Sequence, residues 1–181
     1  FEEVARRWGK VDFLIHSIAF ARKEDLEGRY VDTSREGFRV ALDTSAYSLV
    51  ALTRAAAPLM RHGGSILTLS YYGAEKAIKN YNVMGVAKAA LEASVRYLAA
   101  DLGSEGIRVN AVSAGAIKTL SAKGIRGFGE MLGTCAERTP LRRNVEPSEV
   151  GKAAVFLLSD ASSGITGEVL HVDTGYHILG M

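Results

Sequence analysis

The sequence predicts an α/β fold, a doubly wound parallel sheet with helices on both faces. Four short apolar segments, at 11–16, 65–70, 108–113 and 168–173, alternate with helical or long connecting segments. Strands that are apolar along their length and joined by such crossovers are typical of parallel sheets buried on both sides. A chain of 181 residues with 48% hydrophobic content can bury one sizeable core, so we expect residues 1–181 to form a single domain.

Composition argues against several classes of protein. A net charge of +2 with scattered basic residues is too small to indicate nucleic-acid binding. No apolar run approaches the roughly 20 residues that cross a bilayer, so we expect a cytoplasmic protein without a membrane partner. The single cysteine, Cys135, cannot form an internal disulfide and suits a reducing compartment. The four histidines lack the spacing of metal ligands, and we expect no metal site.

The first half of the chain is expected to hold two helices and two strands. Residues 1–8 have the pattern of the last turns of a helix. A buried strand follows at 11–16, and a helical region extends from about 34 to 60. A glycine pair then precedes the strand at 65–70.

The second half repeats this alternation. Apolar residues at helical spacing predict a helix over 82–102, followed by the strand at 108–113. We assign no regular element to the long segment 114–144. A proline opens the next helix, over 147–159, because its fixed φ suits a first helical turn. The strand at 168–173 is the last element.

A tyrosine and a lysine seven residues apart lie at the start of the predicted helix 82–102. Seven residues turn about 700°, so Tyr81 and Lys88 share one face, roughly 10 Å apart along the axis. A nearby ammonium favours the phenolate and makes the phenol a better proton donor and oxyanion partner. Such a pair also occurs by chance on surface helices. Its place after the carboxyl end of an apolar strand favours a site, because open α/β sheets bind ligands there.

The segment 70–88 resembles the short-chain dehydrogenase/reductase superfamily and, within it, the bacterial NADH-dependent enoyl-acyl-carrier-protein reductases. Most of the superfamily has a Tyr followed four residues later by a Lys. The enoyl reductases have these two residues seven apart and a second Tyr ten residues before the first, and Tyr71, Tyr81 and Lys88 keep both spacings. The sequence at 80–85, Asn-Tyr-Asn-Val-Met-Gly, is close to a family signature.

A second pair, Tyr72 and Lys76, has the four-residue spacing of the carbonyl-reducing members. Those enzymes place a strand-end Ser about a dozen residues before the Tyr, whereas Ser70 is only two residues before Tyr72. We therefore expect Tyr72 and Lys76 to be solvated loop residues. An ordinary ketoreductase or alcohol dehydrogenase stays open as an alternative, as does a non-catalytic dinucleotide-binding protein.

The resemblance covers essentially the whole chain and implies a Rossmann-type, dinucleotide-binding catalytic domain. None of the 19 glycines forms the glycine-rich turn that opens such a domain. We therefore expect about 75 further family residues, with the first three of seven strands, ahead of Phe1, so that 1–181 is the carboxyl-terminal ~70% of the domain. The residue that distinguishes NADH from NADPH would lie in that part, and this chain alone should bind NADH weakly.

The resemblance also implies a set of site residues. The catalytic residues would be Tyr71, Tyr81 and Lys88. Residues that bind the cofactor NAD, as NADH, would be Ser17, Ile18, Ala19, Lys88, Ile117, Lys118, Thr119, Leu120 and Ser121. Residues that line the acyl pocket would be Phe20, Ala21, Leu26, Tyr71, Met84, Ile125, Phe128 and Met131. Scattered apolar residues of this kind are more often core than pocket, so the last set depends on the resemblance alone.

The implied reaction is the reduction of the trans-2 double bond of an enoyl thioester by NADH in fatty-acid elongation. Hydride reaches C3, Tyr81 stabilises the enolate, Lys88 holds the nicotinamide ribose and Tyr71 lines the acyl pocket. The substrate would arrive on an acidic acyl carrier protein, which the basic residues Lys118, Lys123 and Arg126 could meet. The family also implies a homotetramer, with the tail 175–181 as part of an interface.

Overall fold

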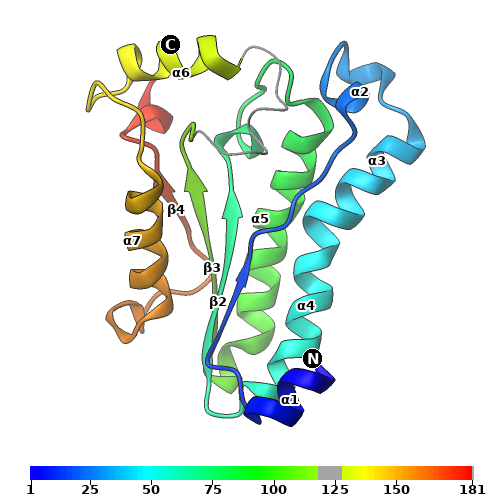
Figure 1. The fold of residues 1–181 in the computed structure, drawn as a ribbon, viewed down its shortest axis with the longest axis vertical. Coiled ribbons are helices and arrows are strands. Elements are labelled where there is room, and N and C mark those ends of the chain that lie inside the picture. Colours follow the sequence, from blue (N-terminus) through cyan, green and yellow to red (C-terminus); the bar gives the residue numbers. More distant parts are fainter. Residues whose placement is uncertain (118–127, 181) are drawn as a thin grey trace.

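The predicted parallel sheet is confirmed. The computed structural model describes residues 1–117 and 128–180. The sheet has four parallel strands in the order β1-β2-β3-β4 (Figure 1). The strands are β1 (Phe13–His16), β2 (Gly64–Ser70), β3 (Ile107–Ala114) and β4 (Val169–Val172). Each lies at a predicted apolar segment, with ends that differ by no more than two residues.

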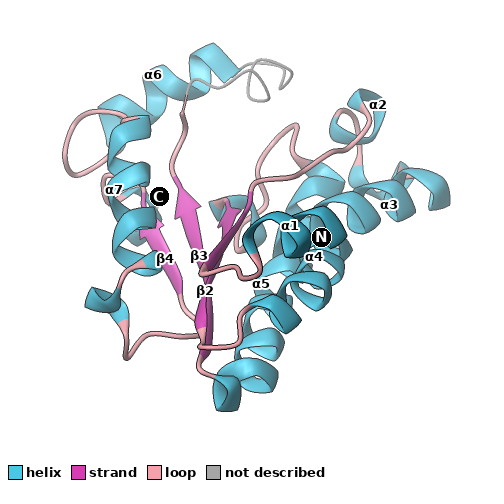
Figure 2. Cartoon of the chain, turned by 60° about the horizontal axis from the view of Figure 1, so that its bottom comes forward, coloured by secondary structure: helices cyan, strands magenta, loops and turns pink. Residues whose placement is uncertain are grey.

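Helices cover both faces of the sheet, as Figure 2 shows. On one face, α4 (Ser48–Ala56) and α5 (Asn82–Leu102) pack on side chains such as Ile66 and Val109. On the other face, α7 (Pro147–Leu158) packs on Leu67. Consecutive strand residues face opposite sides, so an apolar strand supplies both cores at once.

The predicted helical region 34–60 is divided into four parts. It consists of α3 (Arg35–Leu42), a π-helical segment (Asp43–Tyr47), α4, and a 3-10 turn (Ala57–Leu59). Ser34 caps α3, because its side chain accepts a hydrogen bond from the backbone N–H of Gly37 at 2.9 Å.

Two further helices lie in segments for which the sequence predicted none. They are α2 (Lys23–Leu26), a single turn, and α6 (Phe128–Arg138). The first helix, α1 (Glu2–Trp8), is where it was expected. Five short 3-10 turns complete the described elements, at Tyr30–Asp32, Tyr72–Ala74, Gly103–Glu105, Asp160–Ser162 and Tyr176–Ile178. No described helix has the length and apolar character needed to span a bilayer.

The carboxyl ends of all four strands lie on the same side of the sheet, toward the top of Figure 1, where α2 and α6 lie. Strand register aligns Ser70 with Ser113 and Ser113 with His171 at this edge. Thr68 is aligned with His16. The fold therefore gathers polar side chains of four different strands where an open α/β sheet binds its ligands.

Candidate active site

Two phenol rings meet at the carboxyl end of β2. Tyr71 follows the last residue of β2, and Tyr81 is the residue immediately before α5. Their ring centroids lie 5.0 Å apart at an interplanar angle of 72°, an edge-to-face contact. Gly73 makes room for this pair, because a Cβ there would lie 2.5 Å from Cδ1 of Tyr81.

The electrostatic environment of Tyr81 differs from the prediction. Tyr81 is at the N-cap position of α5, without a side-chain capping bond, and it is buried. Burial, followed by the neighbouring Tyr71, raises the pKa of Tyr81 above its ordinary value. Burial also raises the pKa of Tyr71 to about 12. The expected lowering of the Tyr81 pKa by Lys88 is therefore not found, because burial dominates, and both phenols keep their protons at neutral pH.

Lys88 lies beneath the end of β2. Its side chain is 7% exposed, and Nζ donates a hydrogen bond to the carbonyl oxygen of Leu69 at 2.6 Å. Burial lowers the pKa of Lys88 to about 8, and Glu92 acts in the opposite direction. The ammonium is thus held next to the strand end from which Tyr71 emerges.

A buried histidine joins β1, β2 and the helix that follows the π-helical segment. His16 Nδ1 lies 2.8 Å from Thr68 Oγ1, and Nε2 lies 2.8 Å from Ser48 Oγ. Ser48 donates its own proton to the carbonyl of Thr44, so it accepts from Nε2–H. Nδ1 then accepts from Thr68, whose other acceptor, the carbonyl oxygen of His16, is farther away at 3.3 Å. Burial first, and then the charge of Lys88, lowers the pKa of His16 to about 4. The imidazole is neutral in the folded protein at pH 7.

The π-helical segment holds the loop that follows β1. Ser45 accepts a hydrogen bond from the backbone N–H of Phe20 at 2.9 Å and donates one to its carbonyl at 3.1 Å. Ser45 thus holds the backbone of Phe20, which directly follows the predicted cofactor residues Ser17, Ile18 and Ala19, whose side chains are exposed. π-Helical turns are often found at functional sites.

The predicted acyl-pocket residues are brought together only in part. Ala21, Leu26, Met84 and Tyr71 pack in one cluster with Tyr81. Phe20 is 53% exposed and lies outside this cluster. The predicted residues Lys118, Thr119, Leu120, Ser121 and Ile125 lie outside the described residues, as do the side chains of Phe128 and Met131 on α6. Ile117, partly buried, is the last described residue before that gap. The assignment of the whole set stays a prediction.

A cavity of about 460 Å³ lies beside Tyr71, over the ends of β2, β3 and β4. Its walls include Tyr71, Gly115, Cys135, Asn144 and Tyr176. Only Tyr71 among these five was assigned to the site from the sequence. The other four come from α6 and from segments after β3 and β4. They are far apart in the chain, so no local sequence pattern indicates that they line one cavity.

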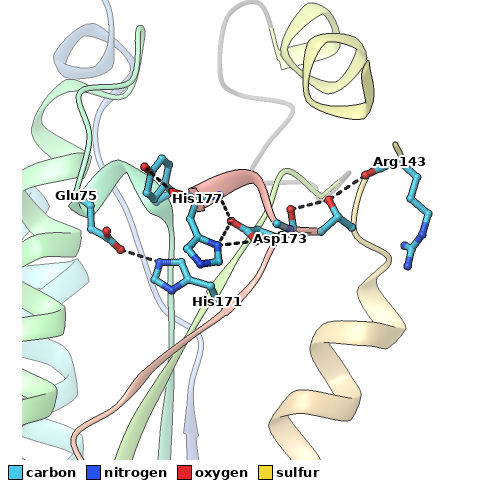
Figure 3. Close-up of polar contacts among 8 residues, drawn as sticks. Glu75, Arg143, His171, Asp173 and His177 are labelled. Carbon is cyan, nitrogen blue, oxygen red and sulfur yellow. Dashed lines mark hydrogen bonds and ion pairs between the residues drawn. The ribbon is translucent and has the colours of Figure 1, made fainter. Parts of the chain in front are cut away.

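Four ionisable side chains form the polar cluster shown in Figure 3, and one of them, Asp173, lines the cavity. His171 Nε2 lies 2.7 Å from a carboxylate oxygen of Glu75, and Asp173 accepts from the backbone N–H of His177 at 2.8 Å. Asp173 also lies 3.0 Å from His177 Nδ1. The two imidazole rings stack with centroids 4.0 Å apart. This cluster joins β4 and the tail after it to the loop between Tyr71 and Tyr81.

Tyr72 corrects a second expectation. It is buried rather than solvated, and its hydroxyl donates to the carbonyl of His177 at 3.2 Å. Its ring also packs edge-on against His171 and Tyr176. Lys76 is exposed, as expected. Because Tyr72 is occupied in holding the tail, it does not form a Tyr and Lys pair with Lys76.

Comparisons with known proteins identify relatives of the chain. A family model described as Enoyl-(Acyl carrier protein) reductase matches residues 1–177. The chain is 59% identical over 181 residues to the Enoyl-[acyl-carrier-protein] reductase [NADH] 1 of Rhizobium meliloti. That match covers 100% of this chain and 66% of the relative.

Solved structures agree with these matches. The Bacillus cereus enoyl-acyl carrier protein reductase with NADP+ and indole naphthyridinone has a TM-score of 0.98 at 57% identity. The Anaplasma phagocytophilum reductase in complex with NAD has a TM-score of 0.96 at 54% identity. This chain covers 70% and 69% of those two chains, and each match includes 99% of this one. It thus spans about two thirds of the length of its relatives.

Proposed function

Because the chain belongs to the enoyl-(acyl carrier protein) reductase family, we propose that it reduces the trans-2 double bond of enoyl thioesters carried on acyl carrier protein. NADH, when bound, supplies a hydride to C3 of the substrate. The C2–C3 π electrons move toward the thioester, negative charge develops on its oxygen, and a proton added at C2 completes the saturated product. The reaction consumes one NADH and one proton and releases NAD⁺.

The described residues suit this chemistry. Tyr81 is a buried phenol that keeps its proton, so it donates a hydrogen bond to the thioester oxygen where charge develops. Tyr71 supports that ring from its edge and borders the cavity over the strand ends. The ammonium of Lys88 has three N–H groups and uses one on the carbonyl of Leu69, so it is a donor suited to the hydroxyl groups of a dinucleotide.

The observation that carries the proposal is the separation of seven residues between Tyr81 and Lys88. Carbonyl reduction puts hydride on the carbon that bears the oxygen, whereas conjugate reduction puts it two carbons farther away. Moving the Tyr from four to seven residues before the Lys shifts its attachment by about 4.5 Å at 1.5 Å per residue. That is the direction and size which conjugate reduction requires.

The test compares two thioesters in the presence of NADH. We expect absorbance at 340 nm to fall with crotonyl thioester and to change little with acetoacetyl thioester. Deuteride from labelled cofactor should appear at C3 of the saturated product. A parallel assay with NADPH checks the cofactor, because solved relatives hold both NAD and NADP+. Robust acetoacetyl reduction, or label on a carbinol carbon, would replace this assignment with a ketoreductase.

A homotetramer in the cytoplasm is the form in which we propose the protein acts. Large apolar side chains are exposed on α5, on α7 and in the tail after β4, namely Tyr97, Val155 and Ile178. Exposed apolar groups on several elements support contacts between chains. Light scattering should give the mass of four chains per particle, and a monomer at micromolar concentration would contradict this assembly.

A further inference from the structure

A buried carboxylate lies one helical turn beyond Lys88 and has no part in the mechanism above. Glu92 is 8% exposed and follows Lys88 by four residues on α5, which places both side chains on one face. Its carboxylate accepts a hydrogen bond from Ser70 Oγ, also buried. A buried charge is costly unless it is paired, so this position calls for an explanation.

The two side chains are held by consecutive residues of β2. Lys88 Nζ donates to the carbonyl of Leu69, and the carboxylate of Glu92 is bound by the hydroxyl of Ser70. The end of β2 therefore anchors both an ammonium and a carboxylate that project from one face of α5. The charge of Glu92 favours the protonated form of Lys88, and burial opposes it.

We propose that Glu92 is a positioning residue for Lys88. The carboxylate of Glu92 is held by Ser70 and is the counter-charge that keeps the buried ammonium of Lys88 protonated and directed at the end of β2. The inference rests on the role proposed for Lys88 in binding the cofactor. It assigns to Glu92 no contact with substrate or cofactor.

Other titratable groups lie around Lys88 and Glu92. His16, on β1, faces Lys88 as a neutral imidazole at pH 7. Burial and the neighbouring Glu75 raise the pKa of Glu92, while Ser70, His171 and Arg96 lower it. Glu75 is itself paired with His171 (Figure 3). On balance the pKa of Glu92 is raised, chiefly by burial, and the hydrogen bond from Ser70 is the largest effect that favours the carboxylate.

The test is Glu92→Gln, which keeps an acceptor for Ser70 and removes the charge. We expect the midpoint of the Lys88 ¹³Cε NMR titration to fall by roughly one pH unit. A midpoint that falls from about 8 by one unit leaves about a tenth of the lysine protonated at pH 8 instead of half. NADH binding should then weaken about fivefold at pH 8 and by less than twofold at pH 6.

Glu75→Gln is the matched control, because it removes a carboxylate that faces Glu92 but is not one turn from Lys88. Its Lys88 midpoint should stay close to that of the wild type. Thermal melts confirm that each variant is folded. If Glu92→Gln does not fold, Ser70→Ala is used instead, and we expect it to lower the Lys88 midpoint by a smaller amount. An unmoved midpoint in the folded variant overturns the proposal. The NMR titration tests the role of Glu92 even if the wild type does not reduce crotonyl thioester. Failure of the proposed function is detected by the crotonyl assay alone, so the two failures are distinguishable.

Discussion

Replacing Tyr81 by Phe is expected to lower kcat for crotonyl thioester by about 10²- to 10³-fold, the loss typical of removing one donor to a developing oxyanion. The ring of Phe fills the same buried space and keeps the edge contact with Tyr71. The fold should therefore survive, and NADH affinity should change little. Steady-state kinetics, circular dichroism and a cofactor titration measure the three quantities.

Tyr71→Phe is the control for that experiment. It removes a hydroxyl from the other ring of the pair while the ring itself still packs against Tyr81. We expect a smaller loss of kcat than for Tyr81→Phe. If the two variants lose activity equally, or if Tyr81→Phe keeps most of its rate, Tyr81 is not the donor to the thioester oxygen.

Replacing Lys88 by Met is expected to raise the dissociation constant for NADH by about 10- to 100-fold, because a charged hydrogen-bond donor is typically worth ~1.5–3 kcal/mol. Stability should change as well, in two opposing ways. Met avoids the cost of burying an ammonium whose pKa is lowered to about 8, but it leaves the carbonyl of Leu69 and the carboxylate of Glu92 without the ammonium. Fluorescence titration with NADH and urea unfolding separate the two effects.

Lys79→Met is the matched control for Lys88→Met. Lys79 is exposed and lies on the wall of the cavity beside Tyr71, whereas Lys88 is buried and bonded to the end of β2. Its NADH affinity should stay within about twofold of the wild type, since exposed charges contribute little. Unchanged affinity in Lys88→Met would remove that residue from the cofactor site.

The parts of the fold set by local patterns could be predicted from the sequence. The apolar run of β2 and the helical spacing of α5 are continuous in the chain, and their bounds agree with the structure within one residue. The Tyr81 and Lys88 pair is local in the same sense. The family and the reaction it implies follow from that short segment together with Tyr71.

Features that depend on distant residues could not be predicted. Tyr72 reads as a polar loop residue, but its partners His171, Tyr176 and His177 are about 100 residues away in the chain. α2 is a single turn, and α6 contains two glycines that weaken its helical pattern. The spacing of four residues indicates that Glu92 shares a helix face with Lys88. The burial of Glu92, however, depends on Ser70 and the strand ends, which are distant in the chain.

The π-helical segment between α3 and α4 has a consequence for helical phase. Ala41 and Leu49 are both fully buried although eight residues separate them, which on an α-helix is about 800° and leaves them about 80° apart. A π turn takes in one more residue than an α turn. Eight residues across it therefore turn about as far as seven otherwise would, and the mismatch shrinks to about 20°. The extra residue thus restores the helical phase, so α3 and α4 bury the same side of one continuous helix. The same arrangement places Ser45 at the backbone of Phe20 and Ser48 at His16.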